Sequence, residues 1–506
     1  MRLLLVYPES RSLQTLPPLG LASLAAYVRR ELAGIEIRVA DLRLPAARER
    51  FDELLSGFRP DVMGVYGMGP DADLVGAFLH RVRPRTRWLV LGGPLATSFH
   101  AHALASYPLD YLVAGEGEIP FTKLLARLGE GREDVEGLAR TARKGEPYLR
   151  HDPAADLVAD LDTLPFPAWD LFDVSAYFAI YRNAMSNVLG RRRVLPVFTS
   201  RGCPFTCAYC HHIFGKKWRA RSPENVLAEI RWLVDNFGVD ALEILDDSAN
   251  LHRDRIVAIL SGIAREHPNL RLSFPNGLRT DLLTEEVVDW LEKAGTYRIS
   301  LGIEVGTRKS QRALGKIQSF SRIERVVRYL ATKKGLVVGG FLMIGAPGET
   351  RKDVLATFAF ARRLPLDMVS THIVTPFPGS PLFARLSEEQ QRALMEIPPH
   401  RFDYATLPFS LCELSHEDLA RLLRFGYVSF YSSPRRMLSL LRKISLNDLT
   451  RGGVEMLRFI SARKDRVLTA ASSPCPEYPP LIRKAAKISR GVSPAGEPPS
   501  GSPSPS

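Results

Sequence analysis

The chain has 506 residues, 45% of them hydrophobic and 24% charged, which is enough for two or three packed domains. Its net charge of +13 is spread along the chain instead of clustering near aromatic residues, so charge alone predicts no nucleic-acid-binding surface. No apolar run approaches the roughly 18–20 residues of a membrane span, and the N-terminus lacks the apolar core of a signal peptide, so we expect a cytoplasmic protein.

Residues 1–140 are predicted to form a doubly wound, Rossmann-like α/β domain, because short aliphatic runs alternate with amphipathic helical stretches. In such sheets, ligands bind beyond the carboxyl ends of the strands. Here those ends carry Gly67, Gly92–Gly93 with Thr97, and Gly115–Glu116–Gly117. Any one of these glycines is also explained by an ordinary tight turn between a strand and a helix, so only the whole set suggests a ligand-binding edge.

A linker is expected over residues 141–190, where the run LDTLPFPAWDLFD predicts a segment packed between two domains. Residues 191–385 then repeat about six strand–helix units, including predicted helices over Pro223–Phe237 and Arg253–Glu266. This pattern predicts a partial parallel barrel of the (β/α)6 type, whose active site lies at the carboxyl ends of the strands.

The C-terminal part is predicted to contain a helical segment over residues 386–465, with apolar residues at three- and four-residue spacing. We expect this segment to cover the barrel mouth. Residues 466–506 are rich in Pro, Ser and Gly without apolar periodicity, which predicts a disordered tail.

Three of the five cysteines form a C-x3-C-x2-C motif, Cys203, Cys207 and Cys210, directly after a predicted strand. Thiolates are soft ligands suited to iron–sulfur clusters, and three of them leave one iron open for a substrate or cofactor. A structural zinc site normally has four protein ligands, so the zinc alternative requires His211 or His212 as the fourth.

This motif after a first barrel strand resembles the radical S-adenosylmethionine (SAM) superfamily. The resemblance implies a 4Fe–4S cluster held by the three cysteines, with SAM bound at its open iron. It also implies that Tyr209 lies against the adenine, although a packing aromatic is the alternative.

Four further residues are implied SAM contacts by the same resemblance. Asp246 and Asp247 end the second barrel strand near the SAM amino group, Arg279 follows the third strand, and Glu304 ends the fourth near the ribose. The alternatives are a helix cap for the aspartates, a surface ion pair for Arg279 and a solvated carboxylate for Glu304.

The first domain resembles the cobalamin-binding domain of cobalamin-dependent radical SAM methyltransferases and of the anaerobic magnesium-protoporphyrin monomethyl ester oxidative cyclase. This implies cobalamin contacts from Gly67, Gly92, Gly93, Thr97, Gly115, Glu116 and Gly117. The D-x-H-x-x-G motif that supplies a cobalt-binding histidine in other cobalamin domains is absent from residues 1–150.

The resemblance therefore implies a radical SAM enzyme that transfers a methyl group to an unactivated carbon or phosphorus of a small-molecule, lipid or natural-product substrate. Flavodoxin or ferredoxin is the expected electron donor. An oxidative cyclase or rearrangement enzyme is the alternative with the same motifs. An RNA methylthiotransferase would need further cysteines, and residues 1–202 have none. The alternative from another class is a zinc-stabilised nucleic-acid-binding protein.

Overall fold

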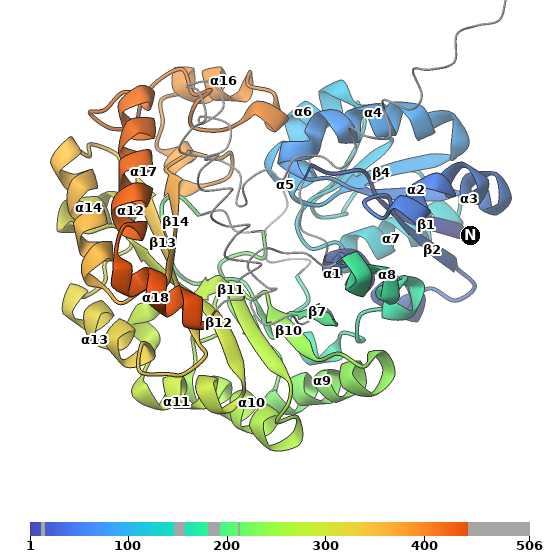
Figure 1. The fold of residues 1–506 in the computed structure, drawn as a ribbon. Coiled ribbons are helices and arrows are strands. Elements are labelled where there is room, and N and C mark those ends of the chain that lie inside the picture. Colours follow the sequence, from blue (N-terminus) through green and yellow to red (C-terminus); the bar gives the residue numbers. More distant parts are fainter. Residues whose placement is uncertain (12–15, 146–156, 181–192, 211–212, 444–506) are drawn as a thin grey trace, which may run out of the picture.

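The computed structural model describes residues 1–11, 16–145, 157–180, 193–210 and 213–443. Two α/β halves lie side by side, the N-terminal one in blue and the second one in green to orange (Figure 1). Each half is built around one six-stranded sheet. The expected fold class, a Rossmann-like domain followed by a partial barrel and C-terminal helices, is confirmed.

The first sheet has the order β2-β1-β3-β4-β5-β6, and every pair is parallel except β5 with β6. Helices cover both faces, which explains why its strands read as continuous apolar runs. The antiparallel strand β6 belongs to this sheet although it follows residue 140, where we expected the domain to end. The strands are β1 (Arg2–Tyr7), β2 (Glu36–Asp41), β3 (Val62–Tyr66), β4 (Trp88–Gly92), β5 (Tyr111–Val113) and β6 (Thr141–Arg143). The helices are α1 (Leu19–Glu31), α2 (Pro45–Glu49), α3 (Phe51–Phe58), α4 (Ala72–Val82), α5 (Pro94–Ser98), α6 (His100–Ser106) and α7 (Glu118–Gly129), with 3-10 turns η1 (Gly69–Asp71) and η2 (Arg83–Arg85).

The second sheet has the order β14-β13-β12-β11-β10-β7, all parallel and in chain order, as a partial barrel requires. Its strands are β7 (Val194–Val197), β10 (Ala241–Ile244), β11 (Arg271–Leu278), β12 (Thr296–Glu304), β13 (Val337–Ile344) and β14 (Met368–Ile373). The helices around it are α9 (Pro223–Phe237), α10 (Arg253–Glu266), α11 (Glu285–Lys293), α12 (Arg308–Leu314), α13 (Phe320–Leu330) and α14 (Arg351–Arg363), with η6 (Thr280–Leu282). The bounds predicted for α9 and α10 are confirmed.

The described residues 157–180, within the expected linker, contact both halves. They contain η3 (Leu161–Thr163), η4 (Trp169–Leu171) and α8 (Val174–Ile180). On the first half, the Ala168 amide donates to the Ala22 carbonyl at 3.0 Å. On the second half, the Ser222 amide donates to Asp162 Oδ1 at 2.9 Å. The segment therefore contacts both halves through its backbone and its side chains.

The C-terminal segment does not cover the barrel mouth with its long helix, so that expectation is wrong for α17 (His416–Tyr431). This helix packs against α14 and along β14, an edge strand of the open barrel. Two edge amides donate to its tyrosines, Val369 N to Tyr431 Oη at 3.2 Å and Thr371 N to Tyr427 Oη at 3.0 Å. An edge strand left bare would expose unpaired amides, which explains the position of the helix.

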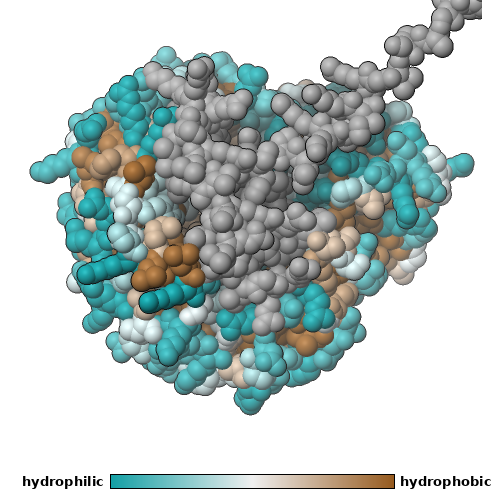
Figure 2. All heavy atoms as spheres, viewed as in Figure 1, coloured by the Kyte–Doolittle hydropathy of each residue, from teal (hydrophilic) through white to brown (hydrophobic). Residues whose placement is uncertain are grey.

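The remaining elements of this segment are α15 (Pro381–Ala384), α16 (Glu388–Met395), η7 (Pro399–Arg401) and α18 (Pro434–Lys443). Helices α17 and α18 keep Phe425, Val428, Leu438 and Leu441 exposed, and brown patches lie over this region in Figure 2. The predicted tail, residues 466–506, lies outside the described residues. None of the described helices is long and apolar enough to cross a membrane.

Replacing both Tyr427 and Tyr431 by Phe is expected to lower the free energy of unfolding by about 2 kcal/mol, because each hydroxyl that accepts from an edge amide contributes about 1 kcal/mol. Urea denaturation measures the change. The control is Tyr329→Phe, which removes a hydrogen bond to Asp289 on α11 and leaves the sheet edge intact. A double variant as stable as the parent would contradict the edge-protecting role.

Candidate functional site

The cysteine motif lies on a loop closed at its base by a small two-stranded sheet. Strand β8 (Ser200–Arg201) pairs antiparallel with β9 (Arg219–Ala220), so both ends of the loop are held together. Gly202 follows β8 with φ +83, and a Cβ placed there would lie 2.4 Å from the Lys217 carbonyl oxygen. Only glycine fits this close approach of the two loop ends.

The middle of the loop is pinned to the barrel through Ala208, which is fully buried. Its amide donates to the Leu314 carbonyl at 2.8 Å, and its carbonyl accepts from the Leu382 amide at 2.8 Å. Leu382 belongs to the run TPFPGSPL, and Leu314 ends α12. Two segments remote in sequence thus fix the residue between Cys207 and Tyr209.

None of the three loop cysteines forms a disulfide, and each is half-buried. Burial raises the pKa of Cys207, and burial together with the neighbouring Cys207 and Asp247 raises the pKa of Cys210 to about 12. The Ser248 hydroxyl donates to Cys203 Sγ at 3.3 Å. The protein alone thus disfavours the thiolate forms of Cys207 and Cys210, whereas bound iron favours them, so this donor set fits an iron–sulfur cluster.

A single-ion site is not apparent in the part of the chain that the structure describes, because no three His, Cys, Asp or Glu side chains there converge on one point. Cluster ligands bind different iron atoms and need not converge in this way. His211 and His212, the additional ligands of the zinc alternative, lie outside the described residues.

Tyr209 and Glu304 are brought together at the end of β12, and their contacts with SAM stay predictions. Burial and the Glu304 carboxylate raise the pKa of Tyr209 well above its ordinary value. Glu304 has φ +63, a strained conformation for a residue other than glycine, and such strain concentrates at functional sites. Lys316 Nζ binds Glu304 Oε1 at 2.7 Å and would lie 2.3 Å from a Cβ at Gly302.

The two aspartates after β10 differ in their surroundings. Asp246 is buried and its carboxylate accepts from the Thr199 amide and from the hydroxyls of Thr199 and Ser200, so it ties β10 to the strand leading into the cysteine loop. Its side chain is thus engaged by the protein, and its contact with SAM stays a prediction, as does that of Asp247. Asp247 reaches the surface beside the loop, but the surrounding protein partly desolvates its carboxyl group, and this desolvation together with the negative Asp246 raises its pKa to about 6.

Arg279 lies beside the cysteine loop, with its guanidinium carbon 3.4 Å from the ring centroid of Phe205, between the first two cysteines. It also binds Asp281 Oδ2 at 2.8 Å. Its role toward the SAM carboxylate stays a prediction, with part of its hydrogen-bonding capacity already used by Asp281.

The predicted cobalamin residues meet at the carboxyl edge of the first sheet. The Thr97 hydroxyl donates to the Gly93 carbonyl at 3.0 Å and accepts from the Gly115 amide at 2.9 Å, and the Gly67 amide donates to the Gly92 carbonyl at 3.0 Å. At Gly93, with φ +86, a Cβ would lie 2.9 Å from the Gly67 carbonyl oxygen. This glycine-lined edge fits a large planar cofactor, which needs close approach of backbone.

Glu116 differs from the rest of this set. Its carboxylate is buried and binds the guanidinium groups of Arg201 and Arg219 in the second half of the chain. Two arginines thus balance the charge of Glu116, and its contact with cobalamin stays a prediction, together with those of Gly115 and Gly117.

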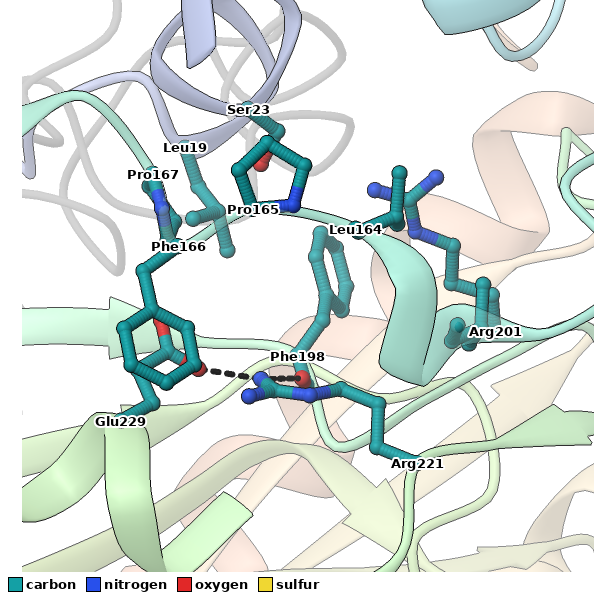
Figure 3. A pocket seen from close by; sticks show the side chains of 11 residues that line it. Leu19, Ser23, Leu164, Pro165, Phe166, Pro167, Phe198, Arg201, Arg221 and Glu229 are labelled. Carbon is teal, nitrogen blue, oxygen red and sulfur yellow. Dashed lines mark hydrogen bonds and ion pairs between the residues drawn. The ribbon is translucent and has the colours of Figure 1, made fainter. Parts of the chain in front are cut away.

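A hollow on the seam between the halves is distinct from both predicted cofactor edges. It is bounded by α1, the linker, the end of β7, and α9 (Figure 3). On its floor, Arg221 binds Glu229 and donates to the Phe198 carbonyl at 3.0 Å. Among the residues predicted for SAM or cobalamin, none lines this hollow, so it belongs to the packing of the halves.

Several residues of the site gave no signal in the sequence. Lys316, Ser248, Arg201 and Arg219 stand in no motif, and each acquires its partner only by folding. Arg201 alone has a local signal, because it adjoins Gly202, the glycine at the start of the cysteine loop.

Two family profiles match the chain. The Radical SAM superfamily profile matches residues 197–361, and the B12 binding domain profile matches residues 10–125. The matched segments contain the cysteine loop and the glycine-lined edge respectively.

Three curated relatives show similarity over most of the chain. The uncharacterized methyltransferase PH0819 of Pyrococcus horikoshii is 31% identical over 87% of this chain and 94% of its own length. The cytidylyl-2-hydroxyethylphosphonate methyltransferase of Streptomyces wedmorensis is 27% identical over 72% of this chain and 77% of its own. The anaerobic magnesium-protoporphyrin IX monomethyl ester cyclase of Rubrivivax gelatinosus is 26% identical over 77% and 70%.

Solved structures share the fold. The radical SAM methyltransferase TsrM of Kitasatospora setae, with cobalamin and a [4Fe-4S] cluster bound, aligns with a TM-score of 0.61 at 21% identity, over 75% of this chain and 73% of its own. The cobalamin-dependent enzyme OxsB aligns with a TM-score of 0.67 at 14% identity, over 93% and 74%. With a cysteine loop on a partial barrel, a glycine-lined edge on a Rossmann-like domain, and these matches, the chain belongs to the cobalamin-dependent radical SAM enzymes, which use a 4Fe–4S cluster, SAM and cobalamin.

Proposed function

We propose that this enzyme transfers a methyl group to an unactivated carbon or phosphorus of a small molecule, lipid or natural-product intermediate. The observation that carries the proposal is the joining, in one chain, of the three-cysteine loop and the glycine-lined edge. When bound there, the cluster with SAM and the cobalamin supply radical hydrogen abstraction and a transferable methyl group. The printed names of two relatives, both methyltransferases, support this reaction over others.

The chain's own residues have defined tasks in this proposal. Cys203, Cys207 and Cys210 hold the cluster, and Ala208 keeps their loop docked on the barrel. Tyr209 lies against the adenine of SAM. Because Lys316 binds Glu304 at 2.7 Å, it fixes the carboxylate that accepts from the ribose hydroxyls.

The remaining SAM and cobalamin contacts are proposed at the two edges already described. Asp247, exposed beside the cysteine loop, accepts from the SAM ammonium, and Arg279 reaches the SAM carboxylate. On the first sheet, Gly67, Gly92, Gly93, Thr97, Gly115 and Gly117 approach cobalamin through backbone and one hydroxyl. Holding both cofactors and the substrate in register is the protein's main contribution.

An electron donor such as flavodoxin or ferredoxin is also part of the proposal, since reductive cleavage of SAM requires one electron. Both donors and reduced free thiols are typical of the cytoplasm, where we place the enzyme. The zinc-stabilised nucleic-acid-binding alternative has no support from either family profile.

The test is anaerobic reconstitution with iron, sulfide and hydroxocobalamin, followed by metal analysis and incubation with SAM and a chemical reductant. We expect one cluster and one cobalamin per chain, and release of both 5′-deoxyadenosine and S-adenosylhomocysteine. Release of 5′-deoxyadenosine without S-adenosylhomocysteine would favour the oxidative-cyclase alternative, which the Rubrivivax relative's name represents. A chain that binds zinc and no cluster would overturn the proposal.

A further inference from the structure

Four charged side chains form a buried network across the seam between the halves. Arg201 Nη1 lies 3.3 Å from Glu116 Oε2, and Arg201 Nη2 lies 2.8 Å from Glu118 Oε1. Arg219 binds both oxygens of Glu116 through its two Nη atoms. No side chain of the four is more than 6% exposed, so the network is shielded from solvent and salt.

The two arginines also contact groups of the protein other than the two glutamates. Arg219 donates to the Val158 carbonyl at 2.7 Å and to the Phe214 carbonyl at 3.1 Å, and the Arg201 guanidinium lies 5.5 Å from the Phe214 ring centroid. A guanidinium group bound to several fixed acceptors is held in one orientation. It therefore fixes the distance between the elements that it joins, which the flexible ammonium group of a lysine does not.

The network joins the base of the cysteine loop to the glycine-lined edge. Arg201 and Arg219 are on β8 and β9, the two strands that close the base of the cysteine loop. Glu116 lies between Gly115 and Gly117 of the glycine-lined edge, and Glu118 begins α7 directly after it. A shift of the cysteine-loop base therefore moves the glycine-lined edge through three ion pairs, Arg201 with Glu116, Arg201 with Glu118 and Arg219 with Glu116.

Stability alone is a poor explanation for this arrangement. Removing four charged groups from water costs several kcal/mol per ion, and apolar replacements of buried ion pairs are often neutral or stabilising. Apolar side chains already lie along the seam, as Leu19, Leu164 and Phe166 do around the hollow. Apolar contacts do not fix the relative orientation of the groups that they join, whereas hydrogen bonds between guanidinium groups and carboxylates do.

We propose that Glu116, Glu118, Arg201 and Arg219 are positioning residues that set the separation of the cysteine loop from the glycine-lined edge, and thus of cluster from cobalamin. This rests on the proposed function, in which both groups act in one reaction. Reacting groups must approach to about 3–3.5 Å, and a misplacement of about 1 Å can cost roughly 100-fold in rate.

The test uses Glu116→Gln/Glu118→Gln in the reconstituted full chain, with Glu118→Gln alone as the milder variant. The first readout is electron paramagnetic resonance: the reduced cluster enhances relaxation of the cob(II)alamin signal, and this enhancement falls steeply with separation. The second readout is S-adenosylhomocysteine release from SAM without added substrate. We expect the double variant to bind iron and cobalamin as the parent does, with altered relaxation enhancement and at least roughly tenfold slower release.

The matched control is Glu229→Gln. Glu229 is as deeply buried as Glu116 and also binds an arginine, but its partner Arg221 lies in the same half of the chain. Loss of this pair lowers stability without breaking a connection across the seam. We expect the control to unfold at a lower temperature while keeping the parent's relaxation enhancement and release rate.

Each outcome decides the proposal. Parent-like relaxation and release in the double variant, or equal changes in Glu229→Gln, would overturn it. Loss of iron from Glu118→Gln would also overturn it, by showing that the network serves the cysteine loop alone.

A parent chain that binds no cobalamin contradicts the proposed function instead. Hydrogen exchange of the cofactor-free chain then tests the network, which predicts faster exchange at both residues 115–118 and 200–220 in the double variant only.

Discussion

Cys207→Ala is expected to abolish 5′-deoxyadenosine release from SAM while cobalamin binding is retained. Two thiolates cannot hold a cluster that also keeps one iron open, so reconstituted iron falls with the activity. The cobalamin edge, on the other half of the chain, gains or loses no contact from this change. Measurements are iron and cobalt per chain, the visible absorption of the cluster, and chromatography of the nucleoside products.

The matched control is Cys412→Ala. This cysteine is also a half-buried free thiol, but it contacts Ser410 and Leu414, away from the three-cysteine loop. Its variant should keep the parent's iron and activity. Retained SAM cleavage in Cys207→Ala would refute the ligand assignment.

Gly202→Ala is expected to have nearly as large an effect without removing any ligand. With φ +83, alanine costs roughly 1–2 kcal/mol in backbone strain. The added Cβ would also lie 2.4 Å from the Lys217 carbonyl oxygen, and backbone on both sides leaves no flexible group to yield. The loop base must open, so we expect iron content to fall several-fold after reconstitution.

The control for this variant is Gly335→Ala, which has φ +73 and no atom within 4 Å of the added Cβ. It carries the backbone strain without the collision, so urea denaturation should show a modest loss of stability with parent-like iron content. Equal iron in Gly202→Ala and the parent would show that the cysteine loop tolerates an open base.

Much of the fold could be predicted because apolar periodicity is local. The bounds of α9 agree with the prediction since Ser222, Pro223 and Gly238 mark its two ends by local chemistry: a side-chain cap, a first-turn proline and a left-handed glycine. The cysteine spacing likewise predicted the cluster loop, since its ligands lie within eight consecutive residues. The domain boundaries and individual cofactor contacts stay predictions.

The position of α17 could not be predicted in the same way. Its apolar spacing indicates one buried face but not which surface it buries, and the mouth and the open edge of the barrel were equally suitable. The role of Tyr427 and Tyr431 follows only from their position beside Val369 and Thr371 on β14. Their hydroxyls match the spacing of these two edge amides and accept a hydrogen bond from each.

The sequence by itself determined the two sheets, their order along the chain, and the three thiols, because each depends on periodicity or spacing over a few residues. Only the tertiary structure decided that Glu116 binds Arg201 and Arg219, which are 85 and 103 residues away, and that Lys316 neutralises Glu304. A charged side chain carries no information about its partner until folding removes water from both, and burial then makes the pairing obligatory.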